Sequence, residues 1–216
     1  MFIGHYAVAL AAKKVAPKTS LGTLFLAAEF VDLLSSALLL VGLEHVRIDP
    51  GNTVFTPLDF YDYPISHSLI GTCVWSLVVG LIYFLIRKDQ RSSLVVGLCV
   101  LSHWLLDFVT HRPDLPLGYG GPVVGLGLWN SVAGTMIVEG ILFVVGLTIY
   151  VNTTQKRDQI GVYAFWSMIA VLALIYVGNS AGAPPPNTQI IAIVGNASWL
   201  FVIWGYWADK HRQLKP

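Results

Sequence analysis

The stretch from Ser68 to Ile86 reads SLIGTCVWSLVVGLIYFLI and contains no charged residue over 19 positions. A helix needs about 20 mostly apolar residues to cross the hydrocarbon core of a bilayer. Other mostly apolar stretches of comparable length occur on both sides of it in the chain. They are Leu21 to Leu43, Leu94 to Val109, Val123 to Val151, Ile160 to Val177 and Ile190 to Trp207. The pattern predicts six membrane-spanning helices.

The composition agrees with an integral membrane protein that contacts a lipid bilayer. Of the 216 residues, 55% are hydrophobic and 12% are charged, and the mean hydropathy is +0.67. Soluble domains usually contain about 25% charged residues. The apolar segment Phe2 to Ala12 predicts a short additional helix, which would make seven. We expect an all-α polytopic helix bundle in which residues 1–216 form a single integral membrane domain, with a motif-bearing half (1–115) and a helical remainder (116–216).

The distribution of Lys and Arg predicts how the chain is threaded. The connections Glu44 to Ser66, His111 to Pro122 and Gly178 to Gln189 contain only Arg47 and Arg112. The alternate connections hold eleven of the thirteen cations, and the positive-inside rule places such connections in the cytoplasm. These cations are Lys13, Lys14, Lys18, Arg87, Lys88, Arg91, Lys156, Arg157, Lys210, Arg212 and Lys215. We expect the N-terminus outside and the C-terminus in the cytoplasm. The connection Glu44 to Ser66 is either a lid or a solvated loop.

Four carboxylates lie in or at the edge of the apolar spans, where a charge is costly. A charged side chain at the bilayer centre costs roughly 2.5–3.5 kcal/mol on insertion scales, so each one needs a compensating partner. Glu29 and Asp32 form one polar stripe at helical spacing with Ser36, and Glu139 ends a similar stripe. These stripes are expected to face the bundle interior. The four carboxylates are Glu29, Asp32, Asp107 and Glu139.

The sequence SHWLLDFVTH, which begins at Ser102, has a spacing suited to metal ligands. Helical residues four apart lie along one face, so His103, Asp107 and His111 are aligned. The predicted topology puts this end of the helix at the outer face. For His111, which is followed by Arg112, a solvated loop start is the preferred interpretation over a ligand.

Two further histidines are expected at the same face. His5 lies near the start of the short first helix, and His67 lies in the first turn of a helix that Ser66 can cap. Neutral imidazoles and ionised carboxylates suit Zn²⁺ or a similar divalent ion. We predict one divalent metal, with zinc favoured, in a pocket that opens to the outer face. The favoured metal ligands are His67, His103 and Asp107, and His5 and Asp32 are further ligands or orient them.

A metal with an open coordination position would permit hydrolysis of an ester or phosphoester. Such an ion lowers the pKa of bound water to about 7, which makes a nucleophile. Glu29 or Glu139 is a candidate catalytic proton acceptor. Either carboxyl is equally well explained as a protonated acid hydrogen-bonded across helices, because burial raises a carboxyl pKa. The substrate expected from this location is a lipid or another amphiphile.

The motifs resemble the membrane-bound metal-dependent hydrolases of bacteria, a family also described as LexA-binding, inner-membrane-associated hydrolases. The resemblance lies within residues 1–115. It implies a multi-helix fold in the bacterial inner (plasma) membrane and a metal site at His5, Asp32, His67, His103 and Asp107. Family members have a Pro-Asp-x-Asp motif on the second helix, where this chain has AEFVD ending at Asp32, so one ligand is missing or moved. The motifs are Gly4-His5, the acidic pair of the second helix, Ser66-His67-Ser68-Leu69 and Ser102-His103-Trp104-Leu105-Leu106-Asp107.

Two functions from other classes also fit these residues. In a transporter or channel, the four buried carboxylates would form a proton or ion path. In a non-catalytic scaffold, the polar residues would only fix the packing of the helices. Nucleic-acid binding is not expected, because the net charge is +1 and no basic patch interleaved with aromatic residues is present.

Overall fold

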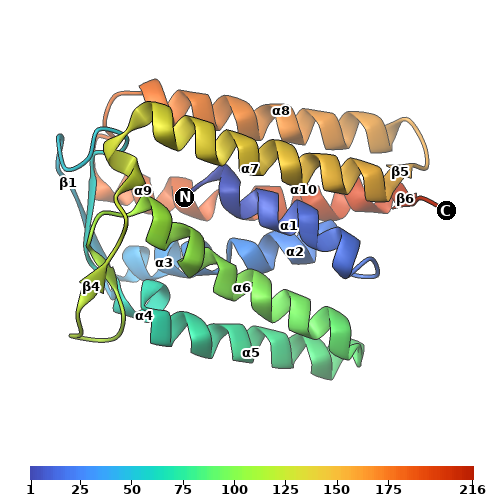
Figure 1. The fold of residues 1–216 in the computed structure, drawn as a ribbon, viewed down its shortest axis with the longest axis horizontal. Helices are drawn as coiled ribbons and strands as arrows, with labels where there is room; N and C mark the ends of the chain where they lie inside the picture. The colour runs from blue at the N-terminus through green and yellow to red at the C-terminus, as the bar shows by residue number, and fades with distance from the viewer.

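The computed structural model describes residues 1–180 and 182–216, and Ala181 lies outside the described residues. Its long helices lie side by side in a bundle, with short two-stranded sheets at the ends (Figure 1). The helices are α1 (Ile3–Val15), α2 (Leu21–Ala28), α3 (Phe30–Val41), α4 (Pro64–His67), α5 (Leu69–Arg87), α6 (Gln90–Thr110), α7 (Val132–Thr153), α8 (Ile160–Ala181), α9 (Thr188–Asn196) and α10 (Trp199–Lys210). The paired strands are β1 (His45–Ile48) with β2 (Leu58–Asp62), β3 (Leu115–Pro116) with β4 (Val123–Val124), and β5 (Thr154–Lys156) with β6 (Arg212–Leu214).

Among the described residues, five helical segments are long and apolar enough to cross a membrane. They are α5, α6, α7, α8 and the segment Thr188–Lys210, which comprises α9 and α10. A sixth results if α2 and α3 count as one bent span. These findings confirm the all-α fold class. The helix α1 has 13 residues, which at about 1.5 Å per residue is too short to span a bilayer.

The segment Leu21 to Leu43, expected to be one straight span, is instead broken in the middle, and whether the pair crosses the membrane stays a prediction. The helix α2 ends and α3 begins at Glu29, and the two are bent by 59°. Glu29 has φ −93° and ψ 0°, outside the helical region, so it caps both helices. The expected stripe from Glu29 through Asp32 to Ser36 is therefore interrupted at its first member.

The span expected from Val123 also begins later than the sequence indicates. Val123 and Val124 form β4, and α7 starts at Val132 after Ser131, whose Oγ accepts from the N–H of Gly134 at 3.0 Å. Gly125 separates the two elements at φ +159°, where an added Cβ would lie 2.1 Å from the carbonyl oxygen of Arg112. Only glycine allows this close approach, so apolar residues before it cannot join the helix.

The first long connection, expected to be either a lid or a solvated loop, contains a two-stranded hairpin, and its role as a lid stays a prediction. Its strands β1 and β2 are antiparallel, with Arg47 opposite Asp59. Asp59 is 2% exposed and forms ion pairs with Arg47 and with Arg112 from another connection. The two arginines found in these connections therefore tie them together through one buried carboxylate.

The short helix α1 lies at the centre of the bundle, among α2, α6 and α7 (Figure 1). Its Tyr6 and Leu10 side chains are fully buried. Gly146 of α7 permits the closest approach, since an added Cβ would lie 2.3 Å from the carbonyl oxygen of Ala7. The chain thus encloses α1, and with it His5, inside the longer helices.

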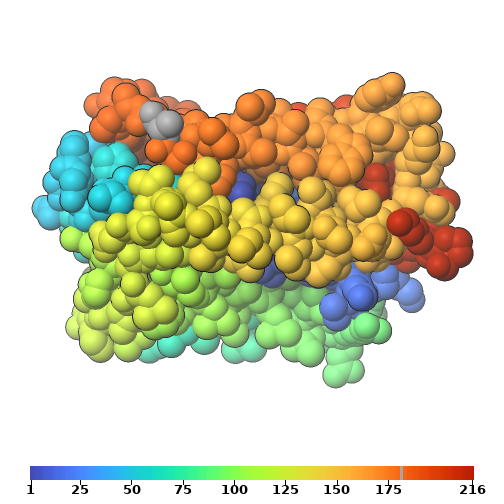
Figure 2. Space-filling model, turned by 45° about the horizontal axis from the view of Figure 1, so that its top comes forward, coloured from blue at the N-terminus to red at the C-terminus, as the bar shows by residue number. Residues whose placement is uncertain are grey.

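The two ends of the bundle differ in charge. The long-loop end contains the connections of residues 42–68, 111–131 and 182–187, and the cationic end contains those of residues 16–20, 88–89 and 154–159 and the C-terminal residues 211–216 (Figure 1). Figure 2 shows the connection 42–68 and the C-terminus at opposite extremes of the molecule. The two sets of connections that the sequence distinguishes by their cations therefore lie at opposite ends.

Candidate metal centre

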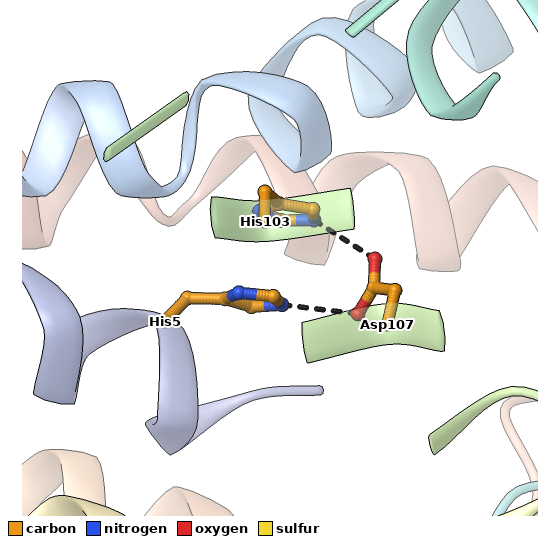
Figure 3. A group of neighbouring side chains, drawn as sticks. All are labelled: His5, His103 and Asp107. Atoms are coloured by element: carbon orange, nitrogen blue, oxygen red, sulfur yellow. Dashed lines mark ion pairs between the residues drawn. The ribbon is translucent and has the colours of Figure 1, made fainter. Parts of the chain in front are cut away.

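His5, His103 and Asp107 meet in the interior of the bundle (Figure 3). The Nε2 atom of His5 lies 3.2 Å from Oδ1 of Asp107, and Nε2 of His103 lies 3.2 Å from Oδ2. The two imidazole rings stack with centroids 3.6 Å apart and planes 4° apart. The nitrogen of Met1 also donates to Oδ1 of Asp107, at 2.5 Å. All three side chains are at most 2% exposed, so the group is held inside the protein.

A second group shares His103 and adds Asp32 and His67. The Oδ1 atom of Asp32 lies 3.2 Å from Nε2 of His67 and 3.5 Å from Nε2 of His103. Nε2 of His67 is also 3.7 Å from Oδ2 of Asp107. The Asp32 side chain is 40% exposed, whereas the His67 side chain is 5% exposed. The structure thus brings all five predicted ligands together, and the centre is accessible on the Asp32 side.

The break between α2 and α3 orients the His103 ring. Carbonyl groups in the last turn of a helix have no partner within that helix. The carbonyl oxygen of Ala28, the last residue of α2, lies 2.7 Å from Nδ1 of His103. Because a carbonyl can only accept, Nδ1 carries the hydrogen, and Nε2 faces the two carboxylates. That contact becomes attractive only with a positive charge between the atoms, from either a proton or a metal ion.

A chain of hydrogen bonds orients the His67 ring in the same manner. Ser66 Oγ donates to Oε2 of Glu44 at 2.6 Å, and the backbone N–H of Ser66 donates to Oε1 at 2.7 Å. The Ser66 oxygen is then the acceptor for Nδ1–H of His67 at 2.7 Å. His67 therefore directs its Nε2 lone pair toward Asp32 and Asp107. Such outer hydrogen bonds fix the tautomer and raise the basicity of a metal-binding histidine.

The expectation that Ser66 caps the following helix is wrong. The cap is Ser68, whose Oγ accepts from the N–H of Gly71 at 3.0 Å. Glu44 was not predicted as part of the centre. It is 1% exposed and lines a cavity of about 240 Å³ between α3 and α9. The only signal in the sequence is a single carboxylate directly after an apolar segment, and nothing there indicates its burial.

Glu139, one of the two candidate proton acceptors, binds the start of α1. Its Oε2 atom accepts from the backbone N–H of Phe2 at 2.8 Å and of Gly4 at 3.3 Å. A carboxylate at this position satisfies free N–H groups and complements the helix dipole. Glu139 therefore helps to position α1 and its His5. Glu29 and Glu139 each keep one buried oxygen without a hydrogen-bond partner among the described residues, and their catalytic roles stay predictions.

The preferred interpretation of His111 as a solvated loop start is wrong. His111 is 3% exposed, with Nδ1 at 2.9 Å from Oδ1 of Asp114 and 3.3 Å from the hydroxyl of Tyr63. Its ring centroid lies 4.3 Å from that of Trp129. Burial lowers the pKa of His111, and the hydrogen bond to Asp114 opposes this effect. His111 joins neither of the two metal-type groups, and it links the connections of the long-loop end instead.

Comparison of the chain with protein-family models, with curated proteins and with solved structures finds no match. The hydrolase family that the motifs resemble therefore stays a prediction. What supports a function is the arrangement of the side chains themselves: three imidazoles and two carboxylates drawn from α1, α3, α4 and α6.

Proposed function

We propose that this chain is a polytopic integral membrane protein that binds a divalent metal ion at its long-loop end and hydrolyses ester or phosphoester bonds. The observation that carries the proposal is the convergence of three histidine Nε2 atoms on Asp32 and Asp107. His67 and His103 each have Nδ1 bound to a protein acceptor, which leaves Nε2 available. Imidazole nitrogen and carboxylate oxygen are ligands that Zn²⁺ accepts, so zinc is the favoured ion.

Membrane embedding is supported by the exposed surface of the helices. Only 6% of the most apolar window of α5 is buried, against 50% for α6. An apolar helix that is exposed along its length is stable in contact with lipid and unfavourable in water. The separation of cations between the two ends favours an N-terminus outside and a C-terminus in the cytoplasm of a bacterial inner membrane.

Hydrolysis is supported by the difference in exposure between the ligands. Asp32 is 40% exposed on its side chain, while the other four are nearly inaccessible. A metal held by these residues would supply an activated water or polarise the scissile group. A substrate would approach on the Asp32 side, next to the helix break. Glu29, at that break, is the better placed proton acceptor, because Glu139 is engaged by the backbone of α1. A lipid or another amphiphile fits a site within a membrane protein.

Elemental analysis of the purified, detergent-solubilised protein tests metal binding. We expect about one divalent ion per chain, and its loss in His67→Ala and His103→Ala. The matched control is His45→Ala at the same end, since His45 is 46% exposed and pairs with Asp62 away from the centre. Absence of metal from well-folded wild-type protein, even after reloading with Zn²⁺, would sink the proposal.

Hydrolysis is tested on zinc-loaded protein with p-nitrophenyl esters of a carboxylic acid and of phosphate. Turnover is expected in the wild type and not in His103→Ala. Glu29→Gln is expected to keep the metal and to lower kcat by about 10²–10⁴-fold, the usual contribution of a proton-transfer residue. If the metal-loaded protein turned over neither ester, the proposal of metal binding would stand and the proposal of hydrolysis would be rejected.

A second candidate function is ion-coupled transport, which the bent span favours. Transporters form ion sites at interrupted helices near the middle of the membrane, and Glu29 is a buried carboxylate at such an interruption. In that case proteoliposomes would show an ion flux that Glu29→Gln or Glu139→Gln blocks. In a scaffold, both substitutions would lower the thermal midpoint and change nothing else.

A further inference from the structure

The cationic end contains a cavity that the proposed function does not use. It has a volume of about 600 Å³ and lies between the α1–α2 connection and the α5–α6 connection. Cavities of about 300–1,000 Å³ are the usual size for small-molecule sites. The lining residues are Lys18, Tyr83, Arg87, Lys88, Asp89, Gln90 and Arg91.

The four cations of this cavity form no ion pair in the described part of the chain. Among the residues that the structure describes, neither Lys18 nor Arg87, Lys88 or Arg91 forms an ion pair. The lining carboxylate is Asp89, and its two oxygens accept from the Ser92 N–H at 3.2 Å and Oγ at 2.8 Å as the cap of α6. The cavity therefore keeps a concentrated positive charge that an anion can neutralise.

The cavity has a fixed frame. The hydroxyl of Tyr83 in α5 lies 3.0 Å from Oγ1 of Thr19 in the α1–α2 connection. Thr19 is 1% exposed, and its carbonyl accepts from Nζ of Lys13 at 2.8 Å. Lys13 is itself buried and paired with Asp209 at 2.9 Å. The cationic lining is thus mounted on connections that buried hydrogen bonds hold together.

Lys88 adopts a backbone conformation that normally belongs to glycine. Its φ of +53° makes it the single non-glycine residue with positive φ in the described part of the chain. The conformation ends α5, because the Lys88 N–H donates to the Phe84 carbonyl at 2.7 Å. Glycine is the usual residue at this point of a helix end. A lysine here places a cation at the cavity at the expense of backbone strain.

The surface next to the cavity is apolar. The last two turns of α5 expose long hydrophobic side chains, with Leu81 56%, Leu85 55% and Ile86 73% exposed. They lead directly to Arg87 at the cavity rim. A ligand that matches both surfaces has a negatively charged head and hydrocarbon chains.

We propose that this cavity binds the phosphate group of an anionic glycerophospholipid, whose acyl chains lie along the exposed face of α5. Basic pockets at the cytoplasmic side of membrane proteins bind such head groups. The inference rests on the membrane embedding proposed above and is independent of the metal centre. It gives the cationic end a ligand of its own.

The test is titration of the full-length chain in detergent with dioleoyl phosphatidylglycerol or dioleoyl phosphatidylcholine, read by native mass spectrometry. Each surface cation contributes about fivefold in affinity for anionic lipid. Arg87→Gln with Arg91→Gln is therefore expected to weaken phosphatidylglycerol binding by about 25-fold and to leave phosphatidylcholine binding unchanged. The matched control is Lys156→Gln with Arg157→Gln, two exposed cations at the same end but outside the cavity.

An equal loss in both double variants would mean that only the general field of this end attracts anionic lipid, and it would overturn the site. A titration with glycerol 3-phosphate distinguishes a lipid phosphate from a soluble phosphate ester as the ligand. Binding at least tenfold weaker than the lipid supports the proposal, and equal binding overturns the lipid as ligand. His103→Ala should bind phosphatidylglycerol as the wild type does, which keeps this test separate from the metal centre.

Lys88→Gly is a second variant, and a loss of lipid binding in it could not be attributed to misfolding. It removes one cation and relieves the positive φ, so the thermal midpoint should hold or rise. Phosphatidylglycerol affinity should nevertheless fall about fivefold. Unchanged affinity would contradict a role of Lys88 in the site.

Discussion

The two ends of the bundle use the same residue types in opposite ways. At the long-loop end, Arg47 and Arg112 are both paired with buried Asp59, and the histidines and carboxylates of the centre contact one another. At the cationic end, Lys18 and Arg91 are exposed and lack carboxylate partners among the described residues. Charge inside the long-loop end is thus satisfied within the protein or by a bound ion. The charge of Lys18 and Arg91 at the cationic end remains available to a partner outside the protein.

Removal of the proposed metal ion should produce the largest difference between the ends. A ligand present at about 1,000 times its Kd stabilises a fold by roughly 4 kcal/mol. Chelation should therefore lower the thermal midpoint of the wild type and expose backbone amides of α1 and α4 to hydrogen exchange. Amides of the paired strands β5 and β6, at the cationic end, should exchange as before. The measurement is hydrogen exchange by mass spectrometry with and without chelator.

The control for this experiment is His103→Ala, because His103 is the candidate metal ligand that the two ligand groups share. Chelator should change neither its thermal midpoint nor its exchange pattern. Equal deprotection at both ends of the wild type would contradict a local metal effect, because it would show that the whole bundle responds.

The hydrogen-bond chain behind His67 should have the next largest effect. Residues that orient metal-binding histidines typically contribute 10–100-fold in metal affinity. Glu44→Gln and Ser66→Ala should each weaken zinc binding by that amount, measured by competition with a fluorescent chelator. Asp49→Asn is the matched control, because Asp49 is an exposed carboxylate of the same connection. Wild-type affinity in both variants would mean that the chain only stabilises the loop.

The sequence predicted much of the fold and the composition of the centre, for a physical reason. Long apolar runs and i,i+4 spacing are local signals, and they located α5, α6 and the pair His103 and Asp107. The break at Glu29 has no such signal, since neither proline nor glycine flanks it. It depends on tertiary contacts, including the one between Ala28 and His103. Glu44 and His111 were missed for the same reason, because only the folded loops bury them.

Arg212 sharpens the comparison from within the cationic end, because it is, like Lys13, a buried cation there. It is 9% exposed, donates to the Oγ1 and carbonyl oxygen of Thr154, and lies 4.6 Å over the ring of Phe165. Lysine cannot reproduce this planar, multiply donating contact. Arg212→Lys should lower the free energy of unfolding by about 1.5–3 kcal/mol, the range for hydrogen bonds to charged groups.

The matched substitution is Arg157→Lys, at an exposed arginine between β5 and α8. It should change the free energy of unfolding by less than about 0.5 kcal/mol, as surface substitutions usually do. Thermal unfolding in detergent measures both variants. Similar losses in the two would contradict the division of this end into buried and exposed cations.

The smallest expected effect is a pH dependence at the long-loop end. Burial lowers the pKa of His111, although Asp114 opposes the shift, so the folded value lies below the unfolded value of about 6.5. The unfolded state then takes up the proton first as pH falls. The stability that buried, neutral His111 contributes is complete above pH 6.5 and declines as the pH falls toward the folded pKa.

His111→Gln removes this dependence of stability on pH. The variant should therefore be destabilised relative to the wild type most at pH 7.5 and least at pH 5.5, by about 1.4 kcal/mol per unit of pKa shift. Parallel pH profiles of the thermal midpoint would show that His111 titrates alike in both states, which its burial beside Trp129 argues against.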